Sequence, residues 1–176
     1  MRWELSWRAD PRAAALADRH YNRQKVGAKQ FVPPGRCLVL VDHRVGQSAT
    51  AFWVTSWPLA QYVRHEWAGA WVCSAFRREP GCVHRASDLI LDAVAATRWR
   101  WPRVPELGMV TFVDEGKTLG ERRRGVGRVV GACFLRAGFE HVGFTKEENL
   151  HAFLLRPERM PPAAPPFGAQ GDFFAP

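Results

Sequence analysis

The sequence predicts a single α/β domain, built on one mixed β-sheet with flanking helices. Seven short apolar stretches have the composition of strands, and three segments with helix signals lie between them. The 176 residues are 47% hydrophobic, which is enough for one core. The chain shows no internal repeat and no linker, so we expect one domain over residues 1–156.

The strands are expected where β-branched, aromatic and small apolar residues run together or alternate with polar ones. Trp3, Leu5 and Trp7 alternate with polar residues, as in a strand with one buried face. The second and third strands are separated only by a turn at residues 43–47, which predicts an antiparallel hairpin. In order, the strands are expected at residues 3–7, 37–42, 49–57, 70–76, 108–113, 141–144 and 151–156.

Each expected helix has a recognisable beginning, end or apolar face. Asp10 is placed to cap the first helix, and Pro11 suits its first position. After Ser87, apolar residues recur every three or four positions in the second helix. Gly138 ends the third helix, since glycine adopts a left-handed conformation most easily. The helices are expected at residues 12–19, 87–98 and 129–137.

Two segments are expected to lack regular structure. Residues 114–128 are polar and basic, which is typical of a loop. Residues 157–176 are rich in Pro, Ala and Gly without an apolar period, and predict a C-terminal tail. Phe167, Phe173 and Phe174 would allow this tail to dock on the domain.

Composition favours a basic protein with an anionic partner. The formal net charge is +8 and the pI is near 10.0, which is typical of proteins that bind polyanions. The four cysteines form no CxxC pair, so the sequence predicts neither a zinc ribbon nor a disulfide framework. We find no signal peptide and no run of about 18 apolar residues, and therefore expect a cytoplasmic protein without membrane contact.

The loop ahead of the second helix predicts an anion site. Arg77, Arg78 and Arg85 surround this loop, and Ser87 lies at the helix start. Free N–H groups and the helix dipole favour a phosphate at such a position, and arginines add charge-assisted hydrogen bonds. The alternative is an ordinary strand–loop–helix unit with solvated arginines.

The order of elements resembles the GNAT (GCN5-related N-acetyltransferase) family. The loop before Ser87 occupies the place where GNAT proteins bind the pyrophosphate of acetyl-CoA. The strand at 108–113 and the helix at 129–137 match the place where the pantetheine arm lies between splayed strands, and residues 136–143 look like the ending of the last GNAT helix. The resemblance implies acetyl-CoA as cofactor. Its implied ligands are Phe76, Arg77, Arg78, Arg85, Ala86 and Ser87.

A second basic loop offers another pyrophosphate site. Residues 122–127 (RRRGVG) fit the GNAT motif R-x-x-G-x-G. In the family this motif follows the fourth strand and opens a long helix, whereas here it directly precedes the last helix. Topology therefore favours the earlier loop.

A closer resemblance is to the Mom-type proteins of phage Mu and its relatives, which modify adenine in DNA. It rests on His20-Tyr21 and on residues 76–79 (FRRE), 111–114 (TFVD) and 131–137 (GACFLRA). This likeness implies transfer of an acetyl-CoA-derived group to adenine N6, which protects DNA from restriction. Two departures are Phe134, where relatives often carry Tyr, and Arg78, where Asn is usual.

The Mom-type resemblance makes His20, Tyr21 and Asp114 the candidate catalytic residues. His20 could be a base or a metal ligand, Tyr21 an acid toward a thiolate, and Asp114 lies at a strand end. Adenine N6 is a weak nucleophile because its lone pair is delocalised, so extra activation is expected. One imidazole with a phenolate or carboxylate would suit iron, which some Mom-type proteins are thought to use. The ordinary alternatives are a helix-end histidine, a half-buried aromatic and a turn aspartate.

Binding of double-stranded DNA is expected from basic residues, because a base modifier must neutralise phosphates and turn the base out. The candidates are Arg23, Lys25, Lys29, Arg122, Arg123 and Arg124. A homodimer is one alternative for the oligomeric state. Two other functions stay open as well: a conventional GNAT enzyme acting on a small-molecule or protein amine, and a non-catalytic GNAT-like module that binds nucleic acid.

Overall fold

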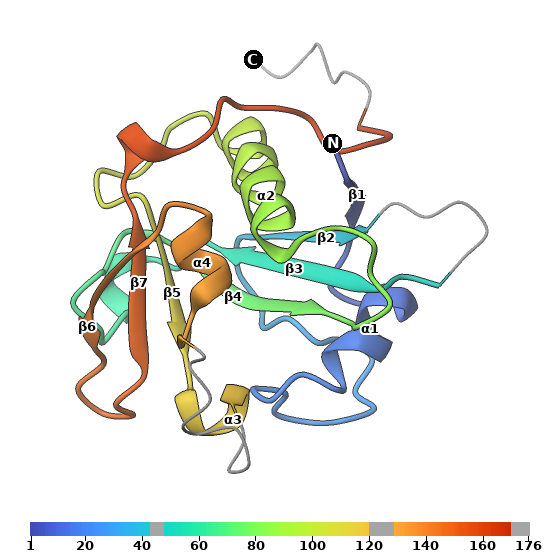
Figure 1. Ribbon diagram of the computed structural model, residues 1–176, viewed down its shortest axis with the longest axis horizontal. Helices are drawn as coiled ribbons and strands as arrows, with labels where there is room; N and C mark the ends of the chain where they lie inside the picture. Colours follow the sequence, from blue (N-terminus) through green and yellow to red (C-terminus); the bar gives the residue numbers. More distant parts are fainter. Residues whose placement is uncertain (43–47, 120–128, 170–176) are drawn as a thin grey trace.

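The computed structural model describes residues 1–42, 48–119 and 129–169. It is a single α/β domain with a seven-stranded mixed sheet and helices on both faces of that sheet (Figure 1). The strands are β1 (Trp3–Ser6), β2 (Cys37–Asp42), β3 (Ala51–Ser56), β4 (Trp71–Arg78), β5 (Met109–Val113), β6 (Glu140–Phe144) and β7 (His151–Leu155). The helices are α1 (Pro11–Ala17), α2 (Ala86–Arg100), α3 (Glu115–Leu119) and α4 (Ala132–Arg136), with 3₁₀ turns at η1 (Ala60–Tyr62) and η3 (Pro157–Arg159).

The strands lie in the order β1-β2-β3-β4-β5-β7-β6. β4 and β5 are parallel, and each other neighbouring pair is antiparallel. A parallel pair needs a crossover connection, which α2 supplies. The predicted hairpin of β2 and β3 is confirmed, with Leu40 opposite Trp53; its turn at residues 43–47 lies outside the described residues.

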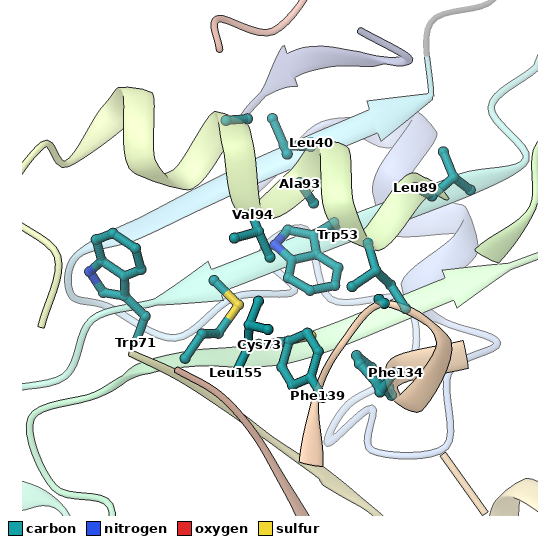
Figure 2. Packing of buried hydrophobic residues seen from close by; sticks show 14 of the residues in the cluster. Leu40, Trp53, Trp71, Cys73, Leu89, Ala93, Val94, Phe134, Phe139 and Leu155 are labelled. Carbon is teal, nitrogen blue, oxygen red and sulfur yellow. The ribbon is translucent and has the colours of Figure 1, made fainter. Parts of the chain in front are cut away.

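The main core lies between one face of the sheet and the helices α2 and α4. Leu89 and Val94 of α2 are fully buried in one cluster with Trp53 of β3 (Figure 2). The apolar spacing along α2 predicted this buried face. On the opposite face, Leu16 of α1 belongs to a second buried cluster with Phe52. Alternate residues of β3 therefore supply the two cores, as the period of a strand requires.

All seven predicted strands are present, each within two residues of the expected bounds. Asp10 caps α1 as predicted, because its carboxylate accepts a hydrogen bond from the backbone N–H of Arg12 at 2.8 Å. Gly138 ends α4 with a φ of +91°. Among the described residues, no helix combines the length and the apolar character needed to cross a bilayer.

Two predictions about the segment between β5 and β6 were wrong in part. The last helix begins at Ala132 and not at residue 129, since Gly131 has a left-handed φ of +67° and stands outside the helix. Residues 115–119 form α3 instead of a loop, because the Asp114 carboxylate accepts from the backbone N–H of Lys117 at 3.1 Å and caps the turn. Residues 120–128 lie outside the described residues.

Residues 157–169 run along the domain as a well-anchored segment. Met160 is buried, and the backbone N–H of Ala164 donates to the carbonyl of Ala95 in α2 at 3.1 Å. Phe167 docks through its main chain, since its N–H donates to the carbonyl of Trp3 at 2.7 Å. Phe173 and Phe174, the other aromatic residues expected to dock, lie outside the described residues.

Candidate active site between two diverging strands

The parallel strands β4 and β5 pair over three residues and then separate. Trp71, Val72 and Cys73 lie opposite Met109 to Thr111, after which β4 continues to Arg78. Figure 1 shows the two strands at a wide angle to each other. Backbone groups on this side of β4 have lost their strand partner and must find other hydrogen bonds. We call this opening the β4–β5 split.

Three consecutive side chains after α1 bridge the split. Asn22 donates through Nδ2 to the carbonyl oxygen of Ser74 at 2.9 Å, and His20 Nε2 lies 3.2 Å from the carbonyl oxygen of Phe76. On the other side, the Tyr21 hydroxyl donates to the carbonyl oxygen of Phe112 in β5 at 3.5 Å. The chain at 20–22 therefore contacts both strands where they no longer contact each other.

His20 is buried between two hydrogen-bond acceptors. Its Nδ1 lies 2.6 Å from Oδ1 of Asn22, and its Nε2 faces the Phe76 carbonyl. A neutral imidazole carries one N–H and can donate to one of these oxygens, whereas the imidazolium form can donate to both. Burial nevertheless lowers the pKa of His20 below its ordinary value, because desolvation disfavours the charged ring. The neutral ring thus predominates at pH 7, and its Nδ1 also lies 3.3 Å from the backbone N–H of Asn22, which can donate to it.

Tyr21 lies at the split near two cysteine thiols, and all three groups are protonated. Burial raises the pKa of its phenol, which keeps the hydroxyl protonated, although the backbone of Asp114 acts in the opposite direction. Burial also raises the pKa of the thiols of Cys73 and Cys133. Tyr21 is itself 37% exposed, so its protonated hydroxyl lies at the solvent-facing edge of the split, next to these buried thiols.

Asp114 lies next to Tyr21 through its main chain, while its carboxylate belongs to α3. That carboxylate accepts from the backbone N–H of Lys117 and lies 3.4 Å from the Lys117 ammonium. The structure thus brings His20 and Tyr21 together, with stacked rings 4.5 Å apart between centroids, and gives the Asp114 side chain a helix-capping position.

These three side chains do not fit an iron site in this arrangement. Both ring nitrogens of His20 face oxygen atoms of the protein, and the Asp114 carboxylate is held by Lys117. In the described part of the chain, His, Cys, Asp and Glu form no group of three that could hold a metal ion.

The arginines of the predicted anion loop hold the loop in shape. Arg78 donates through Nε to the carbonyl of His84 and through Nη2 to that of Cys82, both at 2.6 Å. Arg77 donates through Nε to Glu79 at 2.9 Å. Arg85 is exposed at the start of α2, and its guanidinium has no partner within the described ranges. Arg85 is thus the arginine of this loop that is free to meet a ligand.

The other implied cofactor ligands divide between core and surface. The Phe76 ring packs against Trp53 and Phe134, at centroid distances of 5.6 and 6.2 Å, so its side chain belongs to the core. Ala86 and Ser87 form the first turn of α2, where backbone N–H groups precede the helical hydrogen-bond ladder.

The basic residues expected to bind DNA are not equivalent. Arg23 is almost buried and builds the loop after α1: its guanidinium binds Asp18 at 2.7 Å and the carbonyls of Ala28 and Gln30. Lys25 and Lys29 of the same loop are exposed. Arg122, Arg123 and Arg124 lie outside the described residues.

Two residues of the site were missed in the sequence. Asn22 links His20 to β4, and Glu79 binds both Arg77 and Arg19, which fixes the chain just ahead of His20. The position of Asn22 directly after the His-Tyr pair was an available signal, whereas the partners of Glu79 come from the fold. No protein-family model matches this chain, and no curated protein matches it either.

Proposed function

We propose that this protein is a GNAT-like acyltransferase of the Mom type, which transfers an acetyl-CoA-derived group to adenine N6 in DNA. The observation that carries the proposal is the β4–β5 split with the Tyr21 hydroxyl inside it. The strand order and the separation of one parallel pair support it, because GNAT proteins hold the pantetheine arm between splayed strands of this kind.

The loop geometry favours particular groups for binding acetyl-CoA. Arg85 and the first-turn N–H groups of Ala86 and Ser87 would bind the diphosphate. Arg77 and Arg78 would act indirectly, since their guanidinium groups fix the chain between β4 and α2. The thioester of acetyl-CoA supplies the acyl group and a thiolate leaving group.

The Tyr21 hydroxyl has the protonation state that acyl transfer requires at the leaving group. The amine nitrogen attacks the acyl carbon, the carbon–sulfur bond breaks, and the sulfur takes a proton from the Tyr21 hydroxyl. The proton that the amine loses restores the Tyr21 hydroxyl through water, because both ring nitrogens of His20 face oxygen atoms of the protein. His20 holds Tyr21 in place through its contact with the Phe76 carbonyl and through ring stacking. Asp114 positions the end of β5 by capping α3.

A DNA substrate is supported by charge. The chain carries a net charge of +8, and Lys25 and Lys29 stand exposed on the loop after His20 and Tyr21. Cations on this loop would meet the phosphates that flank the modified base.

The test is mass spectrometry of nucleosides from DNA of cells that express the protein, with Tyr21→Phe as the matched control. A new adenine mass that disappears in the variant would support the proposal. Unchanged DNA together with consumption of acetyl-CoA by another amine would favour a conventional GNAT enzyme. DNA binding without any consumption of acetyl-CoA would favour the non-catalytic module.

A further inference from the structure

A cavity of about 420 Å³ lies on the α1 face of the sheet, beside the β4–β5 split. Its floor consists of sheet residues, among them Phe52, Val54 and Ala75. Its outer wall is the loop after α1, which contributes Gln24, Lys25, Ala28, Gln30 and Phe31. A volume of several hundred cubic ångströms is in the usual range for small-molecule sites.

The lining combines an apolar base with polar groups at the rim. Phe31 meets Phe52 edge to face at 5.9 Å between centroids. Gln24 and Gln30 are exposed at the rim, and their amide groups have no partner within residues 1–42, 48–119 and 129–169. Such amides offer donors and acceptors together, which is the pattern on the edge of a nucleobase.

His20 separates this cavity from the split. Its ring lines the cavity and meets Phe52 at 6.1 Å, while Tyr21 stacks on it from the split. Asn22 and Ser74, which are hydrogen-bonded to each other, also line the cavity. An amine that protrudes from a ligand in the cavity would therefore approach His20 before it reached the split.

We infer that this cavity is the acceptor site and receives an adenine base turned out of a DNA strand. This inference rests on the proposed function and adds the place where the base binds. The half-buried Phe31 ring suits the face of a flat base, Gln24 and Gln30 suit its edge, and Lys25 at the rim suits the adjoining phosphate.

Anchoring of the loop explains how the cavity stays open. Arg23 binds Asp18, Ala28 and Gln30 at once and therefore holds the two ends of the outer wall together. The wall is thus formed without a ligand, and a base would enter an existing site.

The experiment fills the cavity from the loop side. Ala28→Trp places an indole in the lining, whereas Val26→Trp adds the same ring at a 69% exposed position of the same loop that does not line the cavity. Binding of two single-stranded oligonucleotides is measured by calorimetry: one of thymines alone, and one with a single central adenine.

We expect the native protein and Val26→Trp to bind the adenine oligonucleotide about tenfold more tightly than the thymine one. Ala28→Trp should lose this preference and keep the binding that both oligonucleotides share. Retention of the preference in Ala28→Trp, or its absence from the native protein, would overturn the inference.

Coenzyme A binding, measured on the same proteins, separates the two proposals. All three proteins should bind it equally, because the cavity and the start of α2 are different places. Adenine preference without coenzyme A binding would support adenine binding in the cavity and refute the acyltransferase. Coenzyme A binding without adenine preference would refute the acceptor site alone.

Discussion

The rings of His20 and Tyr21 stack at 4.5 Å between centroids and 26° between planes, although the two residues are neighbours in sequence. Side chains of adjacent residues seldom face each other, and here the chain turns directly after α1. His20 is bound to β4 and Tyr21 to β5. One short segment thereby connects the two strands across the gap between them.

Replacement of Tyr21 by phenylalanine should separate chemistry from structure. The lost hydroxyl makes one long contact at 3.5 Å, so the fold and coenzyme A binding should persist. Modification of adenine should slow by about a hundredfold or more, since a general acid contributes that much. Nucleoside mass spectrometry over a time course measures the effect. A wild-type rate in Tyr21→Phe would refute the role of the phenol.

Substitution of His20 by glutamine should change how stability depends on pH. Because its pKa is lowered in the folded protein, His20 contributes stability that is full above about pH 6.5 and is lost as the pH falls through the lowered folded pKa. We expect the melting temperature of the native protein to fall below pH 6.5, and His20→Gln to reduce this fall. Thermal unfolding between pH 5 and 7.5 measures it. His84→Gln, in the loop before α2, is the control, and identical slopes in both variants would contradict the prediction.

Some features of the site could be predicted from the sequence, and others depend on the fold. β4 and β5 could be predicted because apolar runs determine strands, and their separation could be expected only from the family resemblance. The roles of Arg23 and Lys25 could not be distinguished, since both are cations in one polar loop. Only the fold brings Asp18 and two carbonyl groups around Arg23. α3 was missed because its five residues have no apolar period and depend on the cap at Asp114.

Gly131 should not tolerate a side chain. Its φ is +67°, and a Cβ atom there would lie 2.2 Å from the ring of Phe153. Gly131→Ala should therefore cost about 2 kcal/mol or more, from backbone strain together with the clash. Gly81→Ala is the matched control, since a Cβ atom there meets nothing within 4 Å. Urea unfolding compares the two, and equal stabilities would show that α4 is placed differently.

The exposed lysines of the loop after α1, Lys25 and Lys29, should determine the salt dependence of DNA binding. Lys25→Gln with Lys29→Gln should weaken binding to all sequences and reduce the slope of log affinity against log salt by about 2. Titrations at several salt concentrations measure the slope. An unchanged slope would place the DNA on another surface of the protein.

The main chain at Phe167 affects how the sheet can associate with another molecule. β1 is one of the two edge strands of the sheet, and an open strand edge can pair with a strand of another molecule. The bond from Phe167 to Trp3 and the bridge to Glu4 occupy that edge. A strand of a neighbouring molecule could extend the sheet at β1 only after displacing this segment. The segment therefore protects the β1 edge from intermolecular strand pairing.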